Sequence, residues 1–188
     1  MNQVVHTLKE KLFGYKESKK IYAIIDSAVD DTIDGHFESD EPHKEILYRD
    51  EEDRVDLELK APHLIAMEED HPFTERIFQE GHGNYWGCFI VSSVTFETLA
   101  EHLKAYTKIY SQEHKQDVYI RFYDPRAMGQ YFSLFDDDEA EAFFSKIDEI
   151  WVENPKDSNI VYSYSLHQVS LKIQKKEIIL MSQKEDIE

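Results

Sequence analysis

Residues 21–27 read IYAIIDS, an unbroken apolar run that is closed by an acid and a serine. Such a run indicates a strand buried on both faces, because a strand with one wet face would alternate apolar and polar residues. We expect further strands at residues 64–67, 85–91, 118–123 and 150–152, with helical patterns between several of them. The sequence therefore predicts an α/β or α+β fold, in which a mixed central sheet is flanked by helices.

Four segments carry apolar residues at helical spacing. The first ends before Gly14, and the second covers residues 70–81 with a proline in its first turn. A longer apolar stripe runs over residues 95–110. The last segment follows residues 136–139, where an aspartate and a glutamate three residues apart form a capping-box pattern. We expect these four helices to cover the sheet.

The chain is predicted to form one domain over residues 1–155 and a short extension over residues 156–188. Its 188 residues are enough to bury a hydrophobic core. In the extension, apolar residues alternate from Ile160 to Leu166, which predicts a strand with one wet face. Residues 173–181 fit either the second strand of a hairpin or a terminal helix. We therefore expect a β-rich or helical extension that packs on the domain or is available to partners.

The composition is strongly acidic, with 21 lysines and arginines against 39 aspartates and glutamates and a formal net charge of -18. This charge repels phosphate backbones and anionic lipid head groups, so neither nucleic acid nor a membrane is an expected partner. The acids concentrate in residues 30–56, which we expect to be exposed and mobile because like charges resist burial. One hypothesis is an acidic immunity protein that neutralises a basic toxin through this stretch.

Cysteine content and the first residues bear on the cellular compartment. Cys88 is the single cysteine, so a disulfide within the chain is impossible, which is typical of a reducing compartment. Residues 1–12 lack the basic start and continuous apolar core of a signal peptide. No run approaches the roughly 18 apolar residues of a membrane span. We therefore expect a cytoplasmic protein.

None of the catalytic or metal-binding patterns that we tested fits the sequence. Asp26 closes a strand, as a phosphotransfer nucleophile would, but Ala28 stands where a second acid usually lies. Residues 136–139 are acidic, yet the glycine and final glutamate of a calcium loop do not follow them. The nine histidines form no H-E-x-x-H pattern, and no serine lies in G-x-S-x-G. We expect no enzymatic activity, no cofactor and no metal.

Residues 121–126 read RFYDPR and place two cations, an anion and two aromatics at a predicted strand-to-helix turn. Asp26, Arg121 and Asp124 all lie at predicted strand ends, so a small hydrolase or nucleotide-binding enzyme would bring them together at one open pocket. The commoner outcome is structural: Arg121 and Asp124 belong to a buried charge pair, while the aromatics fill the core.

The same RFYDPR segment resembles the signature of the DUF4123 family. Further matching pieces, in the family's order, are residues 22–28 (YAIIDSA), 61–64 (APHL), 80–81 (EG), 86–87 (WG) and 99–103. The resemblance spans roughly residues 21–152 and implies a structural signature made of Asp26, Arg121, Asp124 and Pro125. It also implies a non-enzymatic cytoplasmic adaptor, or chaperone, that binds a type VI secretion effector. Such an adaptor helps to join its effector to the valine-glycine repeat spike or the PAAR tip.

Tryptophan, tyrosine and arginine are the side chains that most often anchor protein interfaces. On this basis the partner surface is expected at Tyr123 and Arg126 of the signature turn, with Trp86 beside them, and at Tyr162 and Tyr164 of the tail strand. Trp86 and Tyr123 would fit equally well in the core.

Overall fold

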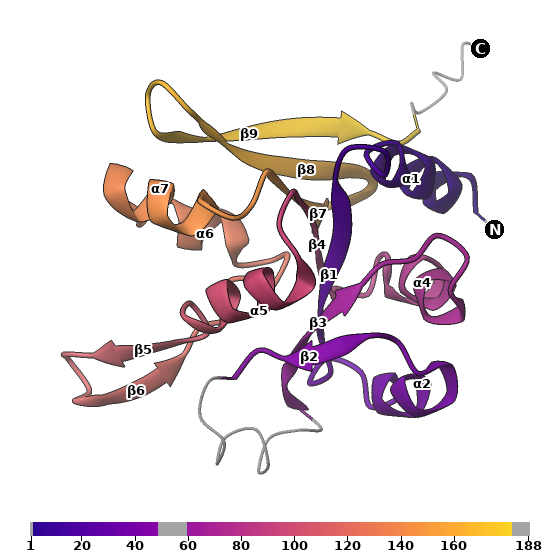
Figure 1. The fold of residues 1–188 in the computed structure, drawn as a ribbon, viewed down its shortest axis with the longest axis horizontal. Helices are drawn as coiled ribbons and strands as arrows, with labels where there is room; N and C mark the ends of the chain where they lie inside the picture. The colour runs from indigo at the N-terminus through magenta and orange to yellow at the C-terminus, as the bar shows by residue number, and fades with distance from the viewer. Residues whose placement is uncertain (1, 49–59, 182–188) are drawn as a thin grey trace.

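A computed structural model describes residues 2–48 and 60–181 of the chain. Its centre is a seven-stranded sheet in the order β2-β3-β1-β4-β7-β8-β9, with β1 in the middle of the first five strands (Figure 1). The strands are β1 (Lys20–Asp26), β2 (Lys44–Ile46), β3 (Pro62–Ala66), β4 (Gly87–Ser92), β7 (Glu149–Asn154), β8 (Asp157–His167) and β9 (Lys172–Ile179). Neighbouring strands pair antiparallel, so the parallel pairs of a mixed sheet are not found among them. The α+β alternative is confirmed.

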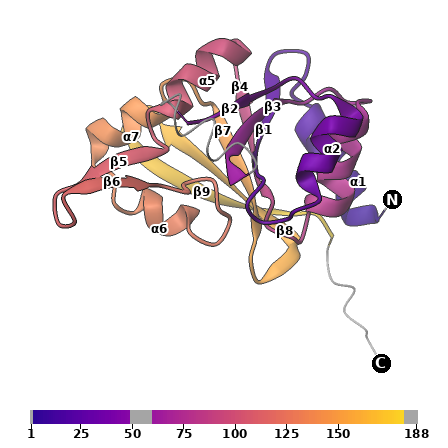
Figure 2. The same cartoon turned by 90° about the horizontal axis from the view of Figure 1, so that it is seen from below.

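Helices cover both faces of this sheet (Figures 1 and 2). One layer consists of α1 (Gln3–Phe13), α2 (Ile33–Asp40), α4 (Pro72–Arg76) and the π-helical turn η2 (Ile77–Gly81). The other consists of α5 (Phe96–Lys104), α6 (Met128–Phe132) and α7 (Asp137–Phe144). Alternate residues of β1 enter the two resulting cores: Ile25 packs in the first and Ile24 in the second. Burial on both faces explains why the run at residues 21–25 is apolar throughout.

Helix ends follow the predicted caps. Asp136 and Glu139 form the capping box of α7, and each accepts a hydrogen bond from the other's backbone N–H. The side chain of His71 accepts from the backbone of Phe73 and begins α4. Gly14 ends α1. The four predicted helices are therefore present, although the third is shorter than expected.

The predicted helix over residues 95–110 and the predicted strand over residues 118–123 need correction. Helix α5 ends at Lys104, and the next residues form a separate two-stranded ribbon of β5 (Lys108–Ser111) and β6 (Gln116–Tyr119). The aromatic spacing at residues 106 and 110 imitates a helix. Pairing across a hairpin, in which Ile109 lies opposite Val118, favours the extended form instead.

The acidic stretch is partly folded, so the prediction that it is exposed is wrong for several of its residues. Ile33 and Phe37 lie one turn apart on α2, and both are buried together with Leu47. The Phe37 ring lies 5.0 Å from that of Phe73 in α4. These apolar anchors order the segment, and at its end the Asp40 side chain, 8% exposed, pairs with Arg76 of α4. The remaining acids of the stretch, at residues 49–56, lie outside the described residues.

The C-terminal residues continue the main sheet as a hairpin, which resolves the choice between strand and helix in favour of strand. Strand β8 pairs with β7, where Trp151 lies opposite Ser163, and β9 pairs with β8. The two faces of β8 do alternate, but the predicted wet face is wrong: Tyr164 packs in the second core, while Val161 and Ser163 on the opposite face are 2% and 5% exposed because that face packs in the first core. Within residues 2–48 and 60–181, none of the helices has the length and apolar character needed to cross a bilayer.

Candidate functional site

The residues of the sequence signature meet at the end of β1. Asp26 is the last residue of this strand and is 2% exposed. Its Oδ2 accepts a hydrogen bond of 2.8 Å from Nε of Arg121 and a second one from Nη2, while its Oδ1 accepts from the backbone N–H of Ala28 at 3.1 Å. The guanidinium thus ties the RFYDPR turn to the first strand of the sheet.

Burial and pairing act in opposite directions on the Asp26 carboxyl. Burial disfavours its charged form, whereas Arg121 favours it; the net effect is a pKa of Asp26 above its ordinary value. Arg121 is less enclosed, because 43% of its side chain is exposed. The pair therefore consists of a buried acid and a partly solvated base. The charged form of Asp26 needs Arg121 for its stabilisation, whereas water can solvate the guanidinium of Arg121.

Asp124 pairs with Arg126, which corrects the expectation of an Arg121–Asp124 pair. Oδ1 of Asp124 accepts from the backbone N–H and from Nε of Arg126, each at 2.9 Å, and Oδ2 accepts from Nη2 at 2.6 Å. Burial raises the pKa of Asp124, but these hydrogen bonds outweigh burial and hold the pKa below its ordinary value. Pro125 is buried within the turn. The signature contains two separate ion pairs, one across the fold and one local.

A buried glutamate supports the loop beneath Arg126. The two carboxylate oxygens of Glu153, in β7, accept from the backbone N–H groups of Gly83 at 2.6 Å and Tyr85 at 2.7 Å. Gly83 and Tyr85 have φ angles of +88° and +59°, a backbone conformation that residues other than glycine rarely adopt. The Arg126 guanidinium lies 5.3 Å from the centre of the Tyr85 ring. The sequence analysis did not identify Glu153 as a site residue, although an acidic residue inside a buried strand indicates that its side chain has a specific partner.

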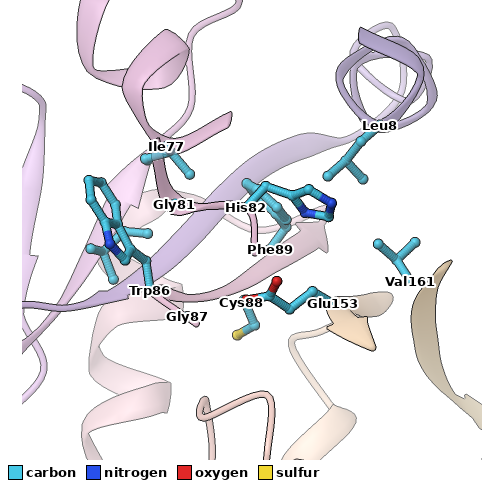
Figure 3. A pocket seen from close by; sticks show the side chains of 11 residues that line it. Leu8, Ile77, Gly81, His82, Trp86, Gly87, Cys88, Phe89, Glu153 and Val161 are labelled. Atoms are coloured by element: carbon cyan, nitrogen blue, oxygen red, sulfur yellow. The ribbon is translucent and has the colours of Figure 1, made fainter. Parts of the chain in front are cut away.

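The loop also borders a small pocket. Figure 3 shows Trp86, Gly87, Cys88 and Glu153 around it. The cavity volume is about 20 Å³, which admits a water molecule and no larger ligand.

A Cβ added to Gly87 would lie 1.8 Å from the carbonyl oxygen of Ile24 in β1. Only glycine fits where these two strands approach.

Three of the five side chains expected on the partner surface lie inside the protein. Trp86 and Tyr123 are each 2% exposed and Tyr164 is 5% exposed, so in this structure all three contribute to the core. Arg126 is exposed, and Tyr162 is half-buried under the ammonium group of Lys175. The expected surface is reduced to these last two side chains. Large aromatic residues are common both in protein cores and at interfaces, so residue type alone does not show which of the two a given aromatic belongs to.

Asp26, Arg121 and Asp124 do lie close together, but the acceptor atoms of both acids are already hydrogen-bonded. An open hollow of about 1030 Å³ lies elsewhere, between the end of α1 and strands β7–β9. Three or more His, Cys, Asp or Glu side chains placed to hold a metal ion are not found in the described part of the chain. The signature geometry favours a structural role.

Ser27 and His63 form a second polar contact beside Asp26. The Ser27 Oγ lies 3.2 Å from Nδ1 of His63, but its hydroxyl donates to the carbonyl oxygen of Ala61 at 2.7 Å. Both side chains are buried, and burial lowers the pKa of His63 to about 4. A buried hydroxyl that is held by a carbonyl is positioned to join strands and not to attack a substrate.

A match to a known protein family identifies the family of the chain. Residues 21–142 match the family described as Domain of unknown function (DUF4123). The chain belongs to the DUF4123 family. The DUF4123 match includes β1 from Ile21 on, the β5–β6 ribbon and the whole RFYDPR turn, whereas Glu153 and strands β7–β9 lie beyond it. No curated protein and no solved structure matches the chain.

Proposed function

We propose that this DUF4123 protein is a non-enzymatic, cytoplasmic adaptor that binds a type VI secretion effector. In this role it helps to load the effector onto the valine-glycine repeat spike or the PAAR tip. Family membership over residues 21–142 is the observation that carries the proposal. The ion pair between Arg121 and Asp26 agrees with it, because Asp26 is buried and its two oxygens accept from Arg121 and from the backbone of Ala28, which ties distant segments of the fold together.

The charge of the chain supports protein partners over other classes. A net charge of -18 disfavours contact with nucleic acid and anionic lipid. Protein interfaces tolerate such a charge where apolar side chains are exposed in a region of low local charge. The exposed large apolar side chains include Ile109 and Tyr110 in the β5–β6 ribbon. These exposed apolar side chains are therefore a candidate contact surface for the proposed adaptor.

A secretion assay tests the function in cells. Deleting the gene should abolish delivery of the cognate effector to recipient cells, while the effector is still synthesised and other effectors of the same apparatus are still secreted. Restoring the gene in trans should restore delivery. Normal delivery of every effector in the deletion strain would contradict the proposal. Protection of the producing cell from a basic toxin, with secretion unchanged, would instead indicate the immunity protein.

A further inference from the structure

Asp34 and Gly35 form the single Asp–Gly pair in the sequence, and no Asn–Gly pair occurs. An aspartate that precedes glycine forms a cyclic succinimide more readily than other aspartates, because glycine has no Cβ to hinder attack by its own backbone nitrogen. The pair lies in the first turn of α2, which consists of Ile33–Asp40. Whether this bond reacts in the folded protein depends on how well α2 protects it.

The nucleophile of the reaction is the backbone nitrogen of Gly35, which lies at the open end of the helix. Gly35 is the third residue of α2, and the N–H groups of a first turn have no acceptor within their helix. The hydroxyl of Thr32, at the capping position, donates to Oδ1 of Asp30 at 2.7 Å and makes no capping bond in the described part of the chain. Gly35 is also exposed to solvent. Its nitrogen is therefore poorly shielded.

The electrophile, the carboxyl group of Asp34, has surroundings that favour the reaction. Ring closure expels a carboxyl oxygen as water, so the protonated form reacts faster than the carboxylate. Burial is the main cause of a pKa of Asp34 above its ordinary value, and the negative charges of Asp31 and Glu38 act in the same direction. Lys60 and Lys44 oppose the shift without reversing it. At neutral pH a larger fraction of Asp34 is therefore protonated than of an unperturbed aspartate.

The helix that carries the pair depends on tertiary contacts for its stability. It has eight residues, and helices of that length are marginal in water on their own. Gly35 lowers its helix propensity, and Asp34 and Glu38 are like charges four residues apart, which destabilises a helix further. Burial of Ile33 and Phe37 holds it on the sheet. Local opening of such a segment costs less than global unfolding and gives Asp34 the freedom that ring closure requires.

We propose that the Asp34–Gly35 bond is a site of spontaneous isomerisation in the folded protein. The Gly35 nitrogen attacks Cγ of Asp34 and loses its proton, so that a C–N bond forms, a C–O bond breaks and one water leaves. Water then opens either carbonyl of the succinimide ring, which restores aspartate or yields isoaspartate. Oxidant, reductant and enzyme are not required. This inference is independent of the proposed adaptor function.

Isoaspartate places one additional methylene in the backbone of α2, between two residues that anchor the helix. Ile33 before it and Phe37 after it are buried in the same core, and the Phe37 ring lies 5.0 Å from that of Phe73 in α4. Both anchors cannot keep their places when the backbone between them is lengthened. The modification therefore loosens the acidic stretch from the core, and we expect the modified chain to melt at a lower temperature than the unmodified one.

The test incubates the full-length protein at neutral pH and physiological temperature. Peptide mapping by mass spectrometry detects the succinimide, which is one water lighter, and an isoaspartate-specific carboxyl methyltransferase labels the isoaspartate. We expect both products at Asp34. The internal control is Asp157, which precedes a serine and whose Oδ1 accepts from the backbone of Asn159 at 2.9 Å. Absence of both products at Asp34, or equal accumulation at Asp34 and Asp157, would overturn the inference.

Variants separate the chemistry of the pair from the opening of the helix. Gly35→Ala adds the hindering Cβ and should slow isoaspartate formation at least about tenfold. Phe37→Leu keeps the Asp–Gly pair but loosens α2, and should accelerate formation about threefold or more. The matched variant Phe143→Leu, in the second core, should leave the rate unchanged. An unchanged rate in Phe37→Leu, or equal acceleration by both leucine variants, would show that local opening of α2 does not control the reaction and would overturn the inference.

Discussion

The side chain of Arg121 donates two hydrogen bonds to one carboxylate oxygen of Asp26, a residue 95 positions earlier in the chain. The two partners differ in their surroundings, since the Asp26 side chain is 3% exposed and that of Arg121 is 43% exposed. Loss of the base leaves a buried acid without its partner, whereas loss of the acid leaves a base that water can reach. The pair should therefore respond unequally to substitution of its two members.

The first prediction concerns stability. We expect Arg121→Met to lower the free energy of unfolding by about 2–3 kcal/mol, because it leaves a buried charged acceptor unsatisfied. Asp26→Asn should cost less, about 1 kcal/mol, since the amide oxygen still accepts from Arg121 and the guanidinium is partly solvated. Urea denaturation at neutral pH measures both variants. A larger loss for Asp26→Asn than for Arg121→Met would show that the pair is not organised around the buried acid.

The second prediction concerns pH. The pKa of Asp26 is raised by burial, and removing Arg121 should raise it further. A carboxyl group with a raised pKa in the folded state gains stability as the pH falls through that pKa, because the folded state then binds the proton more readily. The stability gap between wild type and Arg121→Met should narrow from pH 7 toward pH 5. In the double variant Asp26→Asn/Arg121→Met no such narrowing is expected, and a gap that widened toward low pH would refute this explanation.

The third prediction concerns the loop held by Glu153. Glu153→Gln removes one of the two acceptors for the backbone N–H groups of Gly83 and Tyr85, at a cost of about 1–3 kcal/mol. Amide exchange at these two residues should become faster. The matched variant Glu141→Gln, at an exposed position of α7, should leave their exchange unchanged. Unaltered exchange in Glu153→Gln would mean that the loop is ordered without this carboxylate.

The fourth prediction concerns the contact between β1 and β4. Gly87→Ala should destabilise the protein by at least about 3 kcal/mol or prevent its folding, because the added Cβ would overlap the carbonyl oxygen of Ile24. Gly35→Ala in α2 is the control, since nothing lies within 4 Å of its added Cβ and alanine is the better helix former. Thermal unfolding distinguishes them. Similar melting temperatures for both variants would show that the two strands can separate at low cost.

Local patterns predicted the parts of the fold that local interactions determine. The apolar run at residues 21–25 and the capping box of Asp136 depend on neighbours along the chain, and both are found. The partner of Arg121 and the role of Glu153 depend on contacts between distant segments, for which a single sequence gives little signal. The spacing of Tyr106 and Tyr110 fits a helix as well as a ribbon, and pairing between β5 and β6 decides between them. Buried Trp86 and Tyr123 show the same ambiguity between core and interface.

The most direct test of the central claim, that this DUF4123 chain binds an effector without converting it, is quantitative co-purification. The full-length chain is mixed at micromolar concentration with each effector from its locus, and then with the valine-glycine repeat spike and PAAR proteins. Size-exclusion chromatography with light scattering gives the mass of any complex, and mass spectrometry of the effector reports any covalent change. We expect a stable complex with one effector whose mass is unchanged. Retention of no effector, spike or PAAR protein would contradict the adaptor function, and chemical turnover of the effector would contradict its non-enzymatic character.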